Sequence, residues 1–171
     1  LHFPSYIVDA GFPIALGVQA IALIGLCNVI GTFSAGVLGG RYSKKNLLAY
    51  VYLARALIIA AFFFSPKSVV SVYLFGAMMG LFWLSTVPLT NGLVGQIYGI
   101  RYVSMISGFI FVGHQVGGFL GAWLGGWEYD RTHSYDIVWI LSIVVGVTAA
   151  LLAWPVDERP LRRERAVQAR A

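Results

Sequence analysis

The chain has 171 residues, of which 58% are hydrophobic and only 11% are charged, and its mean hydropathy is +0.78. Soluble domains carry about 25% charged residues, so this composition excludes an ordinary soluble domain. The net charge of +5 does not indicate nucleic-acid binding, because the basic residues cluster between apolar runs and form no groove-sized face. Each of five apolar runs approaches the ~20 residues that cross a bilayer as a helix, which predicts an all-α, polytopic transmembrane bundle.

The first stretch, residues 1–12, combines aromatic residues with Pro4 and Asp9 and is typical of a membrane interface. The chain starts with Leu1 and has no basic segment followed by an apolar segment and a cleavage site. We therefore expect a fragment of a longer chain, without a cleavable signal peptide. The single cysteine, Cys27, lies inside an apolar run, so no disulfide is expected.

Five apolar spans follow in chain order. They cover residues 13–38, 47–64, 69–89, 101–127 and 137–154. Thr90 and Asn91 follow Pro88 and are interpreted as the end of the third span, because proline disrupts a helix. The connections are a hairpin turn at 65–68, a mid-length loop at 95–101 and a polar segment at 127–136. We thus expect a helical bundle over residues 1–154 and a basic, solvated tail over 155–171.

Basic residues are divided unequally between alternate loops. One set of loops and the tail carry Arg41, Lys44, Lys45, Arg101, Arg159, Arg162, Arg163, Arg165 and Arg170. The other loops carry Lys67 and Arg131 together with the carboxylates Asp9, Glu128, Asp130 and Asp136. An excess of basic residues marks the cytoplasmic side, so we expect a multi-pass protein of the plasma (inner) membrane, in contact with lipid, with a cytoplasmic C-terminus.

The span 101–127 contains a stripe of glycines one helical turn apart. The stripe consists of Gly113, Gly117, Gly121 and Gly125. Such spacing places small residues on one side of a helix and predicts a packing surface. His114 and Gln115 lie beside it, and each needs partners because an unpaired polar group in lipid costs several kcal/mol. Their directions differ by about 100°, so we expect only one of them to face a central cavity.

His114 is the one side chain within the spans that titrates near neutral pH in its unperturbed state. It is a candidate to bind substrate or to carry a coupling proton, and the alternative is a neutral hydrogen bond between helices. Arg55 lies near the centre of span 47–64, where a charge normally faces protein or water. It either binds an anion or couples transport, or it bonds backbone carbonyls of neighbouring helices.

Asn28 and Thr32 stand four residues apart in the first span and share a helix face. They either line the cavity or join helices through polar contacts. Trp83 could stack on a ligand, although a large aromatic residue in a membrane helix is more often packing material.

No pattern indicates an enzyme. The sequence has no His, Cys and carboxylate cluster with metal-ligand spacing, no phosphate-binding loop and no acidic pair in the spans, and every carboxylate is expected in a loop or in the tail. We therefore expect no catalysis, no metal and no cofactor.

The segment GVLGGRYSKK, residues 36–45, resembles the signature loop of the major facilitator superfamily, G-x-x-x-D-R-x-G-R-R. The matching positions hold Gly36, Arg41, Lys44 and Lys45. Gly40 stands in place of the Asp, and Ser43 in place of the second Gly. The later segments STVPLTNGLVGQIYG and GHQVGGFLGAWLGGW resemble bacterial carriers similar to the monocarboxylate transporter group.

The resemblance implies the C-terminal half of a twelve-helix carrier, from the end of helix seven to helix twelve, with the N-terminal half as its partner. It implies a secondary transporter that moves a small solute, such as an organic anion, by alternating access, as a symporter or an antiporter. Helix eleven, with its glycine stripe, would then slide against the opposite half.

Two differences from the family's sequence pattern limit which family properties can be expected of this chain. Gly40 removes the carboxylate that would hold the signature loop, which keeps open a non-transporting scaffold or sensor as the alternative. Animal monocarboxylate transporters have Asp and Arg four residues apart in helix eight, where this chain has Asn28 and Thr32, so a lactate-type mechanism is not carried over.

Overall fold

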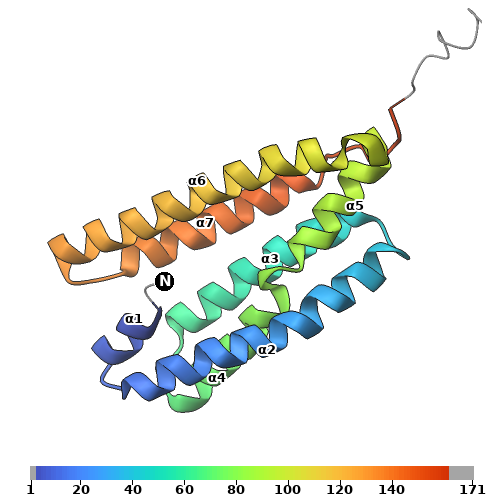
Figure 1. Cartoon of the computed structure of the whole chain (residues 1–171). Helices are drawn as coiled ribbons and strands as arrows, with labels where there is room; N and C mark the ends of the chain where they lie inside the picture. Colours follow the sequence, from blue (N-terminus) through green and yellow to red (C-terminus); the bar gives the residue numbers. More distant parts are fainter. Residues whose placement is uncertain (1–2, 162–171) are drawn as a thin grey trace, which may run out of the picture.

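The computed structural model describes residues 3–161, and α-helices make up most of that range (Figure 1). The helices are α1 (Phe3–Asp9), α2 (Ile14–Gly39), α3 (Lys44–Phe64), α4 (Val69–Trp83), α5 (Thr86–Tyr98), α6 (Ile100–Thr132) and α7 (Asp136–Ala153). Five segments of the described chain are long and apolar enough to cross a membrane, and α4 with α5 makes one of them. The all-α, polytopic fold predicted from the composition is confirmed.

The bundle has two sides that differ in how tightly they pack. α2 packs along α4, and α3 packs along α7 and also touches α4 and α5. Figure 1 shows α6 with α7 on one side of the molecule and α2 with α4 on the other. α6 makes its main contacts with α5 and α7, and its residues 108–121 are all exposed.

The hairpin turn at 65–68 forms as predicted, and its side chains complete both helix ends. Lys67 Nζ donates to the carbonyls of Phe62 (2.8 Å) and Phe63 (3.0 Å), which lie in the last turn of α3, where carbonyls lack intrahelical N–H partners. Ser68 and Ser71 form a capping box at the start of α4, with distances of 3.1 and 2.9 Å.

The third span is a broken helix. α4 ends at Trp83, and α5 continues from Thr86 to Tyr98 after a two-residue break. Pro88 lies in the first turn of α5, where a missing N–H leaves no hydrogen bond unmade. The interpretation of Thr90 and Asn91 as a helix end is therefore wrong, because both lie inside α5.

The loop expected at 95–101 is also absent from the fold. α5 runs to Tyr98, and only Gly99 separates it from α6. Gly99 has a φ of +84°, a conformation that glycine adopts without a steric penalty. Gly99 alone thus connects α5 to α6, because glycine readily adopts a positive φ that other residues rarely adopt.

The polar segment expected at 127–136 is largely helical, since α6 continues to Thr132 and ends at His133, whose φ is 51°. Glu128 is buried in the last turns of α6 and accepts a hydrogen bond from Thr132 Oγ1 at 3.2 Å. Asp9 and Asp130 also lie in helices. The expectation that every carboxylate lies in a loop or in the tail is therefore wrong.

The closest helix packing lies between α2 and α4. A Cβ added at Gly31 would stand 1.9 Å from the Leu81 carbonyl oxygen, and one at Gly80 would stand 2.6 Å from the Ile24 carbonyl oxygen. A Cβ added at Gly76 would stand 3.2 Å from the Ala20 carbonyl oxygen. Glycine lets these two backbones approach more closely than any side chain would allow.

The predicted glycine stripe behaves differently. Within residues 3–161, no atom outside the helix backbone and immediate neighbours lies within 4 Å of a Cβ added at Gly113, Gly117 or Gly121, whereas Gly125 is buried. The stripe is therefore not a packing surface against the other described helices. Sliding of the stripe against an N-terminal half remains a prediction.

Candidate functional site

A cavity of about 740 Å³ opens between α6 and the helices opposite it. Its lining residues are Phe3, Pro4, Tyr6, Ile21, Ile24, Ile59, Phe75, Met79, Trp83, Gly117, Gly118, Gly121, Ala122, Tyr135, Val138, Trp139 and Ser142. None of these described residues carries a charge. The lining has the character of a ligand pocket, which is mostly apolar and aromatic with few polar groups.

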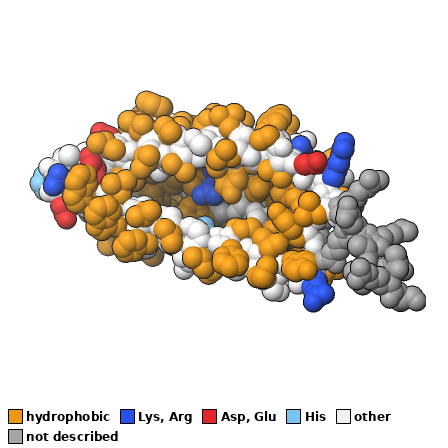
Figure 2. All heavy atoms as spheres, turned by 90° about the horizontal axis from the view of Figure 1, so that it is seen from above, with side chains coloured by type: hydrophobic (Ala, Val, Ile, Leu, Met, Phe, Trp, Pro, Cys, Tyr) orange, Lys and Arg blue, Asp and Glu red, His pale blue; other side chains and the backbone are white. Residues whose placement is uncertain are grey.

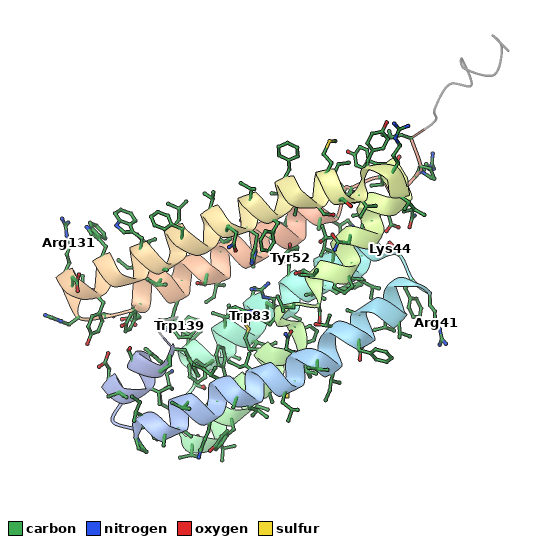
Figure 3. The ribbon with its side chains drawn as sticks, viewed as in Figure 1. Arg41, Lys44, Tyr52, Trp83, Arg131 and Trp139 are labelled. Atoms are coloured by element: carbon green, nitrogen blue, oxygen red, sulfur yellow. The ribbon has the colours of Figure 1, made fainter. Side chains whose placement is uncertain are left out.

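Aromatic rings form one wall of this cavity. Phe75 and Trp139 pack with ring centroids 5.9 Å apart, and Tyr6 and Trp139 pack at 5.2 Å. Trp83 and Trp139 both lie toward the middle of the bundle (Figure 3). The glycines of α6 line the cavity from the other side, so that the predicted stripe contributes Gly117 and Gly121 to its wall.

Arg55 stands at the edge of the cavity. Its guanidinium carbon lies 5.4 Å from the centroid of the Trp83 ring, a cation–π distance. Ile59, four residues later on the same face of α3, lines the cavity. Figure 2 shows a hollow between hydrophobic side chains with a basic side chain in its middle.

The guanidinium nitrogens of Arg55 are accessible to a ligand. Among the described residues, no hydrogen bond or ion pair joins the Arg55 guanidinium to another group, and the side chain is half-buried. No buried side-chain nitrogen or oxygen in this part of the chain is without a partner. Its nitrogens are therefore still accessible, and its contact is the Trp83 ring rather than backbone carbonyls.

Asn28 supports the break between α4 and α5. Its Oδ1 accepts a hydrogen bond from the Leu84 N–H at 3.0 Å and one from Thr32 Oγ1 at 3.4 Å. At membrane depth a freed backbone N–H needs such a partner. Asn28 and Thr32 thus act together, and they join α2 to the broken helix.

His114 and Gln115 are both exposed on α6. His114 stands four and seven residues before the cavity-lining Gly118 and Gly121, so it shares their helix face. Its ring lies 6.2 Å from that of Phe111. Gln115 is turned by about 100° from His114, and the expectation that only one of the pair faces the cavity stays a prediction.

Three polar residues lie about one helical turn from residues that line the cavity, and we call them the polar layer. They are Asn28, Arg55 and His114. Each stands four residues from a cavity-lining residue of its own helix, namely Ile24, Ile59 and Gly118. In each helix the polar residue is on the side of the loop between α2 and α3. The sequence singled out these residues, but only the fold shows that each lies about one turn from the cavity wall.

The signature loop is a short turn over residues 40–43. Gly36 lies in α2, Arg41 is exposed in the turn, and Lys44 and Lys45 open α3. Lys44 Nζ donates to Gln96 Oε1 of α5 at 2.8 Å. Figure 3 shows Arg41 and Lys44 at the same end of the bundle.

A carboxylate that the sequence pattern did not single out holds this loop. Glu158 Oε1 accepts a hydrogen bond from the Lys45 N–H at 2.7 Å, and the Glu158 carbonyl accepts one from Gln96 Nε2 at 3.0 Å. Burial raises the pKa of Glu158, but hydrogen bonds from the start of α3 and from the Ser43 hydroxyl outweigh burial and place that pKa below its usual value.

The tail was expected to be solvated as a whole. Leu161 N donates to the Ile97 carbonyl at 3.0 Å, and Glu158 binds α3, so the described part is attached to the bundle. The remaining tail residues, 162–171, with their basic side chains, lie outside the described residues.

Residues 3–170 match the family profile described as Major Facilitator Superfamily, which covers nearly the whole chain. The chain belongs to this superfamily. A Bacillus subtilis (strain 168) protein, the uncharacterized MFS-type transporter YcxA, is 25% identical over 150 residues. The match covers 84% of this chain and 37% of YcxA, so the chain spans little more than a third of the length of that relative.

Membership of the major facilitator superfamily, together with the apolar helices, makes this a multi-pass membrane protein. The relative is described as a transporter of the same superfamily. Within residues 3–161, no group of three or more His, Cys, Asp and Glu side chains is placed to hold a metal ion. The narrower likeness to the monocarboxylate group stays a prediction.

Proposed function

We propose that the chain supplies the C-terminal half of a secondary transporter that moves a small organic anion, such as a carboxylate, across the plasma membrane by alternating access. The observation that carries this proposal is Arg55, a half-buried cation beside an uncharged cavity, with no carboxylate partner among the described residues. A charge inside a membrane protein normally has a counterion or a functional task. An anionic solute would provide that counterion.

The rest of the polar layer supports the proposal. His114 lies on the cavity-facing side of α6, where it can hydrogen-bond the solute or take up a proton. Asn28, with Thr32, stabilises a broken helix beside the cavity, and transporters of this kind bind solutes at such breaks. Gln115 is turned away from this face and would contact the opposite half.

The gating part of the proposal concerns the signature loop. Lys44 and Lys45 lie on the positively charged side that we assign to the cytoplasm, and the tail binds them through Gln96 and Glu158. Rocking of the two halves would put mechanical stress on the contacts between the signature loop and the tail. Glu158 would then replace the carboxylate that Gly40 lacks.

Uptake by the full-length protein in sealed vesicles with an imposed pH gradient tests the proposal. We expect His114→Ala to reach the membrane at normal abundance, but to lower uptake about tenfold or more and to flatten its pH dependence, because one coupling or binding group is lost. His133→Asn, at the far end of α6, is the matched control and should transport normally.

Undiminished and still pH-dependent uptake by His114→Ala would remove His114 from the mechanism. A protein that binds a partner but moves no solute across the vesicle membrane would instead support the scaffold or sensor alternative.

A further inference from the structure

The walls of the cavity differ from what a small hydrophilic acid needs. Tyr6, Phe75, Trp83 and Trp139 present aromatic rings from three helices, and no lining residue is charged. A short hydroxy acid would leave most of this apolar surface in contact with water or empty space. A solute with a large apolar body would cover this surface and be stabilised by its removal from water.

The opposite wall is flat. A Cβ added at Gly117 or Gly118 would meet nothing within 4 Å, so α6 presents backbone and open space to the aromatic wall. A planar ring fits between such surfaces, because aromatic rings gain from offset stacking and from edge-to-face contact at centroid distances of about 4.5–7 Å.

The charge beside the cavity comes from Arg55. Its guanidinium lies over the ring of Trp83, which lines the cavity. A solute that places its ring between the aromatic wall and α6 and its carboxylate at Arg55 would use both features at once. The guanidinium can bind a carboxylate through two parallel hydrogen bonds.

We infer that the transported anion is an aromatic carboxylate, whose ring occupies the cavity and whose carboxylate pairs with Arg55 next to Trp83. This inference rests on the proposed function for its transport step, but the binding step stands on the cavity and on Arg55. It predicts selectivity for the ring and for the charge separately.

Binding to the purified full-length protein, measured by isothermal titration calorimetry, tests both. The probes are 3-phenylpropanoate, its alcohol 3-phenylpropan-1-ol, the non-aromatic 3-cyclohexylpropanoate and lactate. We expect 3-phenylpropanoate to bind at least about tenfold more tightly than each of the others, since a charge-assisted pair and a stacked ring are each worth about one factor of ten.

Variants test which residue contacts the ring of the solute and which contacts its carboxylate. Trp83→Leu should weaken 3-phenylpropanoate about tenfold and leave 3-cyclohexylpropanoate nearly unchanged, whereas Trp123→Leu, on the far face of α6 from His114, should change neither. Arg55→Gln should remove the preference for the acid over the alcohol, and Arg55→Lys should restore part of it. Thermal unfolding of each variant checks that it is folded.

Uptake in sealed vesicles separates the two proposals. If lactate or another small acid is transported and 3-phenylpropanoate neither binds nor competes, the inferred solute class is wrong while the transporter proposal stands. If 3-phenylpropanoate binds through Trp83 and Arg55 but is not moved, the transporter proposal fails and the binding site stands. Equal binding of acid and alcohol by the unmodified protein would overturn the role of Arg55.

Discussion

Two regions of this protein contain glycines on helix faces, and these glycines have different surroundings. In the α2–α4 pair, Gly31, Gly76 and Gly80 face the backbone of the neighbouring helix. In α6, Gly117 and Gly121 line a cavity instead, and an added Cβ there would meet open space. The same residue type thus serves close packing in one pair of helices and an open wall in another helix.

This difference shows that spacing alone does not determine what a glycine stripe does. A regular four-residue repeat makes a smooth helix face, but a seam forms only where a second backbone lies against it. In the α2–α4 pair the glycines come from both helices, so neither helix alone displays a full stripe. The regular stripe of α6 is the one that stays open.

The largest expected effect is at the α2–α4 contact. Gly31→Ala places a Cβ 1.9 Å from the Leu81 carbonyl oxygen, so the two backbones must separate. We expect a loss of stability of about 3 kcal/mol or more, because overpacking against backbone is not relieved by a side-chain rotation. Thermal unfolding of the purified protein and its abundance in the membrane would measure this loss.

Gly25→Ala is the matched control on the same helix, because its Cβ would meet nothing within 4 Å. It should leave stability unchanged or raise it slightly, since alanine favours a helix by about 1 kcal/mol over glycine. Equal melting temperatures for the two variants would show that α2 and α4 do not pack as closely as described.

A smaller effect on folding, but a large one on uptake, is expected on α6. Gly117→Leu should reach the membrane at normal abundance and lower uptake about tenfold, since its side chain enters the cavity and displaces solute. Gly113→Leu is the comparison variant, because it also adds a side chain in open space but does not line the cavity. Uptake at equal expression distinguishes them.

If Gly113→Leu and Gly117→Leu impair uptake equally, the stripe acts as the sliding surface against the opposite half, and its role in the cavity is secondary. Normal transport by Gly117→Leu would mean that this face of α6 meets lipid.

The smallest expected effect is at the signature-loop end of the bundle, where Glu158 binds the start of α3. Glu158 accepts a hydrogen bond from the start of α3, so Glu158→Gln should lower stability by a few tenths of a kcal/mol, the size expected of an exposed carboxylate at a helix N-terminus. Because its pKa is lowered on folding, this contribution is present above the unfolded pKa, and it is lost as the pH falls through the folded pKa.

The measurement is hydrogen exchange of the Lys45 amide between neutral and acidic pH. The amide should lose protection on acidification in the unmodified protein, and Glu158→Gln should exchange faster at neutral pH without that change. Asp157→Asn is the control, since its carboxylate lies beside Arg159 and not at α3. Identical profiles for the three proteins would show that Glu158 does not hold the loop.

How far the sequence predicts the site depends on the residue. Arg55, His114 and Asn28 stood out because polar groups are costly inside apolar spans, and each stands four residues from a residue that lines the cavity. Tyr6 and Trp139 did not, because aromatic residues are common both in membrane belts and in packing. Glu158 was hidden in a polar tail, where a carboxylate is unremarkable until its partner is known.

The sequence by itself determined the membrane-spanning helices and the superfamily, because burying about 20 apolar residues in lipid is a local requirement that one segment meets alone. Only the tertiary structure decided where the third span breaks, which glycines meet a backbone, and which polar residues lie about one turn from the wall of the aromatic cavity. The physical reason is that these features depend on distances between helices. The helical repeat of a sequence predicts the helix face on which a residue lies. What that face contacts depends on the position of the neighbouring helix.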